Sequence, residues 1–284
     1  MMIKAVVTDM DGTFLDDTGR FNRKRFEQVL VQLEARNIPF IVASGNQLER
    51  LLDLFAGFEH RILFLAENGG LFYYRGEMLF RKVLESSVIE KLVDHYKDQV
   101  EDYCLMVSSD TTIYIDERSP QPFSETGLAI TEVQLQAFWD KIVRLKDLRD
   151  VLEDKTIIHA GFWVKEELVD RLVADCNQIF GGEVLAVTSG YGSVSILPKG
   201  IHKAWGLEQI LEPLGIKAGD VLAFGDSDND LELLSYAGHS YAMDNATARV
   251  KAVAKHIAPS HVDQGVLTVI EEYLEGEADA TTKD

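Results

Sequence analysis

The chain has 284 residues, of which 46% are hydrophobic and 26% charged, a composition that is ordinary for a globular protein with a large core. Its 47 acidic and 28 basic residues give a formal net charge of -19, which argues against nucleic acid as a partner. No apolar run reaches the ~18 residues that span a bilayer, and no leader peptide is evident, so we expect no membrane partner and a cytoplasmic location. Cys104 and Cys176 lie far apart without metal-type spacing, which favours free thiols in a reducing compartment.

The first third of the chain alternates short apolar runs with amphipathic segments. We expect strands at about 6–8, 40–43 and 62–66, because each is a continuous apolar run that ends in polar residues. Helices are expected at about 22–34, where Asn22 can cap the first turn, and at about 48–55. Continuous rather than alternating apolar runs are typical of a parallel sheet that is covered on both faces.

The middle of the chain has a different order of elements. Segments 71–74 and 78–83 predict a hairpin, and a helix is expected at 87–98. Strands at 103–108 and 112–115, a helix at 132–145, a strand at 156–164 and a helix at 166–180 follow. A second hairpin is expected at 184–188 and 193–197. Strands joined as hairpins, followed by helices, predict a separate α+β domain inserted at 85–190.

The last third returns to the pattern of the first. We expect helices at 201–214, after 230, near 250–254 and at 266–274, with strands at 221–224, 241–243 and near 257. The polar segment 276–284 is expected to be a disordered tail. The predicted class is therefore α/β, with a doubly wound, mostly parallel sheet formed by residues 1–84 and 191–275 around the inserted domain.

Polar residues cluster where the predicted parallel strands end, which is where such sheets bind ligands. Asp9 and Asp11 end the first strand, and burying two carboxylates there is costly unless a cation holds them. A divalent metal with oxygen ligands, Mg2+ above all, is the simplest such cation. Three further groups lie in equivalent places, and they are Ser44-Gly45, Lys203 and the run from Asp226 to Asp230.

These groups together predict phosphoryl transfer to an aspartate. The attacking carboxylate of Asp9 faces a phosphate, so both charges need neutralisation, which Mg2+ between Asp9 and Asp226 would supply in part. The ammonium of Lys203 and the hydroxyl of Ser44 can bind the remaining phosphate oxygens. Asp11 can protonate the leaving alcohol and then deprotonate the attacking water.

Backbone amides near Met10 and Gly45 can add further donors for the phosphate. Lys199 is an alternative to Lys203, but Lys203 opens a helix, where its side chain can be aimed rigidly, so we favour Lys203. The alternative structural interpretation makes Ser44, Asp226 and Asn229 simple helix caps, and the aspartates 9 and 11 a polar turn.

The motifs resemble those of the haloacid dehalogenase (HAD) superfamily, in particular phosphatases of the Cof-type group, whose core is Rossmann-like and carries an inserted α+β cap. The residues that carry the resemblance are Asp9-Met10-Asp11-Gly12-Thr13, Ser44-Gly45-Asn46-Gln47, Glu67-Asn68-Gly69, Lys203 and Gly225-Asp226-Ser227-Asp228-Asn229-Asp230. The resemblance implies that Asp9 is the nucleophile and Asp11 the general acid and base. It also implies that Asp9, the carbonyl of Asp11 and Asp226 hold Mg2+. Ser44, Lys203 and Asn229 would bind phosphate, and Asp230 would contact the binding residues rather than the phosphate itself.

One position departs from the pattern of that group. Most Cof-type members have arginine after the Ser/Thr-Gly pair, whereas this chain has Asn46. The Ser-Gly-Asn-Gln form is similar to a branch that contains bacterial sugar phosphatases and a flavin mononucleotide phosphatase. The implied substrate is a small phosphorylated metabolite, with a sugar phosphate as the first choice and flavin mononucleotide as the alternative.

Two further functions fit the same residues. A phosphomutase shares the aspartyl-phosphate but returns the phosphoryl group to another hydroxyl, so only its product differs. A phospho-acceptor switch also groups acidic residues, a hydroxyl and a lysine. Asp11 disfavours the switch, because a general acid promotes turnover rather than a lasting phosphoryl signal.

Overall fold

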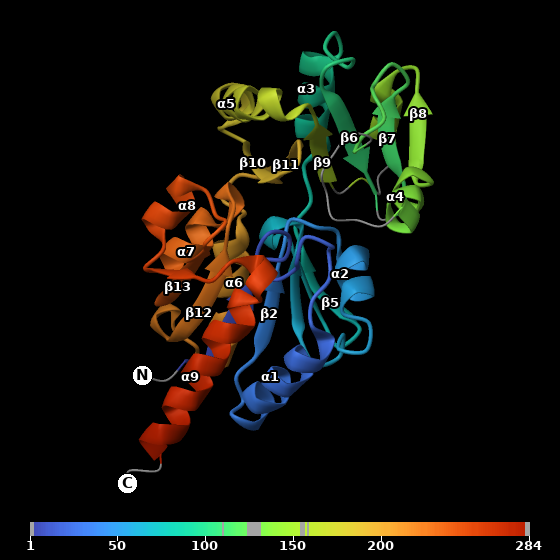
Figure 1. Cartoon of the computed structure of the whole chain (residues 1–284). Coiled ribbons are helices and arrows are strands. Elements are labelled where there is room, and N and C mark those ends of the chain that lie inside the picture. Colours follow the sequence, from blue (N-terminus) through green and yellow to red (C-terminus); the bar gives the residue numbers. More distant parts are fainter. Residues whose placement is uncertain (1–2, 110, 124–131, 154–156, 158, 282–284) are drawn as a thin grey trace. The chain divides into compact units, whose positions relative to one another are not determined.

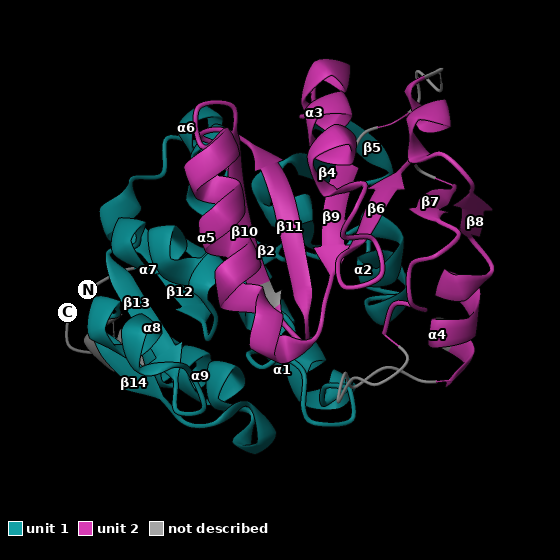
Figure 2. Cartoon of the chain, turned by 90° about the horizontal axis from the view of Figure 1, so that it is seen from above, with its two compact units in different colours: residues 1–81, 202–284 teal, residues 82–201 magenta. Residues whose placement is uncertain are grey.

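The computed structural model describes all residues except 1–2, 110, 124–131, 154–156, 158 and 282–284. The chain divides into two compact units, one formed by residues 1–81 and 202–284 and the other by residues 82–201 (Figure 2). Within the described part of the chain, no helix combines the length and the apolar character that a membrane span requires.

An eight-stranded sheet forms the centre of the first unit (Figure 1). Its strands are, in spatial order, β14 (His256–Ala258), β13 (His239–Met243), β12 (Val221–Gly225), β1 (Ala5–Thr8), β2 (Phe40–Ala43), β3 (Leu63–Ala66), β4 (Leu71–Tyr74) and β5 (Glu77–Arg81). Neighbours from β14 to β3 are parallel, and β4 and β5 add an antiparallel hairpin at one edge. The predicted α/β class with a mostly parallel sheet is therefore confirmed.

Helices connect and cover these strands. They are α1 (Arg23–Ala35), α2 (Leu48–Leu54), α6 (Lys203–Leu214), α7 (Leu231–Tyr236), α8 (Ala248–Val253) and α9 (Gly265–Thr281). Asn22 caps α1 as predicted, since its side chain accepts the backbone N–H of Arg25. Helix α1 lies beside α9, and Arg25 on α1 forms an ion pair of 2.6 Å with Glu271 on α9 (Figure 1). β1, β2, β3 and β12 are buried at every position, because helices shield both faces of a central parallel strand.

The second unit has its own six-stranded sheet and its own core. The strand order is β10 (Val184–Gly190), β11 (Ser193–Pro198), β9 (His159–Trp163), β6 (Cys104–Ser108), β7 (Ile113–Asp116) and β8 (Ile142–Leu145). All neighbours are antiparallel except β7 and β8. The helices of this unit are α3 (Ser86–Tyr96), α4 (Glu132–Trp139) and α5 (Val169–Phe180).

Three expectations from the sequence differ from the structure. The expected helix at 132–145 ends at Trp139, because Ile142–Leu145 pairs with β7 as a strand that includes the β-branched Ile142 and Val143. The second unit ends at residue 201 rather than 190, because β11 pairs with β10 and β9 inside its sheet. Residues 276–281 continue α9 instead of forming a disordered tail, since glutamate and alanine in 275–280 favour helix. Residues 282–284 of that predicted tail lie outside the described part.

Candidate active site

Two neighbouring parallel strands place two of the predicted carboxylates side by side. Asp9 directly follows β1 and Asp226 directly follows β12, and these strands pair with Thr8 opposite Phe224. The backbone N–H of Asp9 donates to the carbonyl of Phe224 at 3.1 Å, which continues the pairing into the loops. The residues that end β1 and β12 therefore meet at one edge of the sheet, as the strand pattern predicts.

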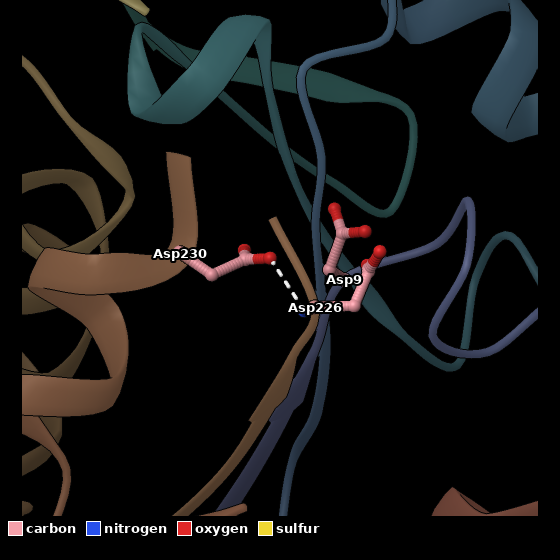
Figure 3. Close-up of side chains that lie close together, drawn as sticks. All are labelled: Asp9, Asp226 and Asp230. Atoms are coloured by element: carbon pink, nitrogen blue, oxygen red, sulfur yellow. Dashed lines mark hydrogen bonds between the residues drawn. The ribbon is translucent and has the colours of Figure 1, made fainter. Parts of the chain in front are cut away.

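Asp9, Asp226 and Asp230 form a compact acidic cluster (Figure 3). Each offers one carboxylate oxygen, and these oxygens lie within 4.8 Å of one another. Burial raises the pKa of Asp9 well above its usual value, against the lowering effect of Lys203. Burial, together with the charge of Asp230, raises the pKa of Asp226 to about 6. Burial thus disfavours the charged forms of Asp9 and Asp226, and a bound cation would offset that cost.

Lys203 supplies a positive charge at the same point. Its side chain is fully buried, and Nζ donates to Oδ1 of Asp9 at 2.5 Å and to Oδ1 of Asp230 at 2.6 Å. Burial by itself would lower the pKa of Lys203, but the charges of Asp230 and Asp9 outweigh it and raise that pKa. Lys199, the alternative lysine, is exposed and belongs to the other unit. The structure therefore brings Lys203 to the aspartates.

Asp230 shapes the loop after β12. Its Oδ2 accepts the backbone N–H groups of Asp226 at 3.0 Å and Ser227 at 3.1 Å, while Oδ1 accepts Lys203. A Cβ on Gly225 would lie 2.5 Å from Asp230, so only glycine allows the loop to close in this way. Both oxygens of Asp230 are thus occupied by donors. Asp9 and Asp226 remain the better placed carboxylates for a metal.

The side chains around Asp226 fit a hard divalent cation. Thr13 Oγ1 donates to Oδ1 of Asp226 at 2.7 Å and orients the carboxylate. Gly12 has φ +76°, and a Cβ there would lie 2.5 Å from Oδ2 of Asp226, so the β1 loop approaches the carboxylate closely. Oxygen ligands from carboxylates and a backbone carbonyl are the set that Mg2+ prefers. Asp9 and Asp226 are the carboxylates that would hold it, and the carbonyl of Asp11 stays a predicted third ligand.

The carboxylate of Asp11 has a different set of partners. Arg50 Nη2 donates to its Oδ1 at 2.6 Å, and Asn46 Nδ2 donates to its Oδ2 at 2.6 Å. Arg50 Nη1 also donates to Oδ2 at 3.2 Å, so the guanidinium contacts both carboxylate oxygens. The ion pair is partly exposed, with 22% of the Arg50 side chain and 19% of the Asp11 side chain accessible. Asp11 is therefore held by the segment that follows β2.

The predicted phosphate-binding residues lie on the neighbouring loops. Ser44 follows β2 and is buried, and its Oγ accepts Nδ2 of Asn46 at 2.8 Å. Gly45 lies beside Asn68, whose side chain accepts Nδ2 of Asn229 at 2.8 Å. Met10 is fully buried, so only its backbone amide can serve a ligand in the way that the sequence analysis expects.

Comparison with known proteins adds an independent observation. A family model described as haloacid dehalogenase-like hydrolase matches residues 6–270. The chain belongs to this family. The predicted resemblance to HAD phosphatases is thereby confirmed.

Relatives of this HAD protein carry names that specify phosphatases. A 5-amino-6-(5-phospho-D-ribitylamino)uracil phosphatase, YbjI, of Escherichia coli K12 is 33% identical over 278 residues, which are 98% of each chain. A phosphoglycolate phosphatase of Methanopyrus kandleri is 30% identical over 281 residues, 98% of this chain and all of that one. A crystal structure of a protein from Streptococcus mutans UA159 has a TM-score of 0.83 at 29% identity, covering 96% of this chain and 99% of that one. The predicted phosphoric monoester hydrolase of the HAD type is thus confirmed.

Sequence reasoning missed two residues of this HAD site. Arg50 lies within α2, whereas Asn46 precedes the N-cap Gln47, so no helical spacing in the sequence links the two side chains that bind Asp11. Asn68 was part of the Glu67-Asn68-Gly69 motif but had no assigned role, although this motif follows an expected strand, which is the signal that marked Asp9 and Asp226. The contacts of Arg50 with Asp11 and of Asn68 with Asn229 join segments that are far apart in sequence.

Proposed function

We propose that the protein is a Mg2+-dependent phosphatase that hydrolyses a small phosphorylated metabolite through an aspartyl-phosphate on Asp9. The observation that carries the proposal is the contact of one buried lysine, Lys203, with Asp9 in a cluster that also contains Asp226. A nucleophilic carboxylate can approach a phosphate dianion only when cationic groups neutralise both. Lys203 supplies one such charge, and Mg2+ between Asp9 and Asp226 would supply the other.

The residues divide the reaction into two steps. A carboxylate oxygen of Asp9 attacks phosphorus, the bond to the ester oxygen breaks, and Asp11 gives a proton to the leaving alkoxide. Asp11 then takes a proton from water, whose oxygen attacks the aspartyl-phosphate and releases phosphate and the free Asp9. Lys203 fixes the orientation of Asp9 through its 2.5 Å hydrogen bond. Ser44 and Asn229 lie on the adjacent loops, where donors for the phosphate oxygens are needed.

The proposed substrate is a phosphate ester at the end of a sugar or sugar-alcohol chain. The 33% identical relative is named for a substrate that carries a phosphorylated ribityl chain, and its similarity extends over 98% of both chains. Flavin mononucleotide, the alternative from the sequence analysis, carries a terminal ribityl phosphate of the same kind, so these two esters share the chemistry around phosphorus. Simple sugar phosphates remain the other candidates.

Phosphate release from a panel of esters tests the proposal. The panel contains the ribitylaminouracil phosphate, flavin mononucleotide, sugar phosphates and phosphoglycolate, each assayed with Mg2+ and with a chelator. We expect release of phosphate with Mg2+ and its loss with the chelator. Absence of release from every ester would refute the hydrolase, and phosphorus NMR that shows an isomerised sugar phosphate would instead identify a phosphomutase.

Two further expectations belong to this proposal. Cys104 and Cys176 are both buried free thiols, which supports the proposed cytoplasmic location, since reducing compartments keep thiols unpaired. The resemblance to Cof-type phosphatases implies that the inserted unit is a cap, and we propose that this cap contacts the leaving group of the substrate. Exchange of residues 82–201 for the corresponding segment of a relative, followed by the same panel, tests it, because a cap that selects substrates should transfer their ranking.

A further inference from the structure

Asn68 has an unusual combination of burial and missing partners. Asn68 is only 1% exposed, yet its side-chain Nδ2 has no hydrogen-bond partner among the described residues. Asn229, 4% exposed, has an Oδ1 in the same condition. Buried amide atoms without a partner are rare in folded proteins, and each requires an explanation.

The two side chains satisfy each other's hydrogen-bonding groups only in part. Asn229 Nδ2 donates to Asn68 Oδ1 at 2.8 Å, which uses one donor and one acceptor. Among the described residues, Asn68 Nδ2 and Asn229 Oδ1 remain without a hydrogen-bond partner, and we call these two groups open. Exchange of O and N in both side chains changes which residue holds the open NH2 group, but it never removes that group. The pair therefore always presents one NH2 donor and one carbonyl acceptor.

The open donor lies among the segments that the proposed function assigns to phosphate. Asn68 is bound to the loop after β2, because its backbone N–H donates to the carbonyl of Ser44 at 2.9 Å. A Cβ added to Gly45 would lie 3.0 Å from Asn68 Nδ2, so the amide borders on that glycine. The next residue, Gly69, packs against the start of α6, where an added Cβ would lie 3.1 Å from Cα of Lys203.

The backbone of this turn adopts a conformation that is unfavourable for most residues. Glu67 has φ +53° and Asn68 has φ +52°, a left-handed conformation that costs free energy for residues other than glycine. Asparagine tolerates it better than most side chains, and glycine would adopt it without strain. Glu67 is anchored by an ion pair of 2.6 Å with Arg81. The backbone conformation by itself therefore does not require asparagine at position 68.

We propose that Asn68 is a substrate-binding residue, whose side-chain NH2 donates to a non-bridging oxygen of the substrate phosphate. The inference rests on the proposed function. A phosphate dianion presents only acceptors at those oxygens, so it matches an NH2 donor that borders on Gly45 and belongs to a turn in contact with Ser44 and the start of α6. Asn68 thereby links the loop after β2 to Asn229 and completes the set of donors around phosphorus.

The test compares Asn68→Gly with Asn37→Gly in the full-length protein. Asn37 also has a positive φ, +56°, but it is exposed at the end of α1, so its substitution controls for the change in backbone freedom. Inorganic phosphate is the probe, and its affinity is measured by calorimetry in Mg2+. Loss of a hydrogen bond to a charged group predicts a weakening of about 10- to 100-fold for Asn68→Gly, with Asn37→Gly unchanged.

Asn68→Asp is the second variant and serves if the glycine variant fails to fold. It keeps an oxygen to accept Asn229 Nδ2 but replaces the NH2 donor by an oxygen, so it distinguishes phosphate binding from mere support of Asn229. Phosphate affinity within about twofold of wild type in a folded variant of either kind overturns the inference. Wild-type protein that binds no phosphate overturns it as well. Wild-type protein that binds phosphate but hydrolyses no ester refutes the proposed function, while the affinities still decide the role of Asn68.

Discussion

Replacement of Lys203 by methionine tests the electrostatics of the site most directly. Methionine has a similar length and suits a buried position, but it leaves the carboxylates of Asp9 and Asp230 without their shared cation. The lysine side chain is fully buried, and its partners are 8% and 0% exposed. Removing one member of a buried ion pair costs about 3–5 kcal/mol, because the remaining charge is left without compensation.

This loss of unfolding free energy can be measured as a lower melting temperature. For a unit of this length, about 1 kcal/mol lowers the melting temperature by roughly 2–4 °C, so Lys203→Met should melt about 6–20 °C below wild type in EDTA. Mg2+ should restore part of the difference, since the carboxylates that lose Lys203 keep more negative charge for a bound cation to neutralise, so Mg2+ should stabilise the folded variant more than folded wild type. Lys199→Met is the matched control, because Lys199 is exposed, and we expect it to change stability by less than about 0.5 kcal/mol.

The pH dependence of the stability loss in Lys203→Met is an independent check of the same reasoning. Burial raises the pKa of Asp9 in the folded protein, and Lys203 opposes that rise. A carboxyl group whose pKa is higher in the folded than in the unfolded state favours the folded state at low pH, and this stabilisation is lost as the pH rises through the folded pKa. The deficit of Lys203→Met should therefore be smaller at pH 5 than at pH 8. Calorimetric melting curves at both pH values measure it. A loss below about 1 kcal/mol in EDTA, or an equal loss in Lys199→Met, would refute the reasoning.

Four further predictions concern catalysis and the metal. Asp9→Asn should reduce phosphate release to below about 1% while circular dichroism shows an intact fold, and greater residual turnover would exclude Asp9 as the nucleophile. Asp226→Ala should raise the Mg2+ concentration for half-maximal activity by at least about tenfold, and an unchanged requirement would contradict its role as a ligand. Because the pKa of Asp226 is raised to about 6, the apparent Mg2+ affinity of wild type should fall about tenfold from pH 7 to pH 5, measured by calorimetry. Arg50→Met should lower kcat by about 10- to 100-fold through loss of its contacts with Asp11, with Mg2+ affinity unchanged; an unaltered kcat would show that these contacts do not serve the reaction.

Residues that directly follow buried strands were the predictable part of the site. Asp9 and Asp226 each end a continuous apolar run, and parallel strands align such ends at one edge of a sheet. Lys203 was favoured over Lys199 because it opens a helix, and the structure places its Nζ against Asp9. Local pattern was less informative in the inserted unit, where Ile142–Leu145 was expected to be helical and forms β8. Pairing with β7 decides the conformation of that segment, and no short window of sequence contains this information.

The amino-acid sequence by itself determined the class of the fold, the family and the carboxylates of the cluster, because periodicity and motif spacing are local properties that survive without a structure. Only the tertiary structure decided which side chains complete the site. Arg50 reaches Asp11 across 39 positions, and Asn229 reaches Asn68 across 161. Such contacts depend on how strands and helices pack, so their donors and acceptors can be counted only after folding. That count leaves one buried NH2 group of the Asn68–Asn229 pair open beside the proposed phosphate site.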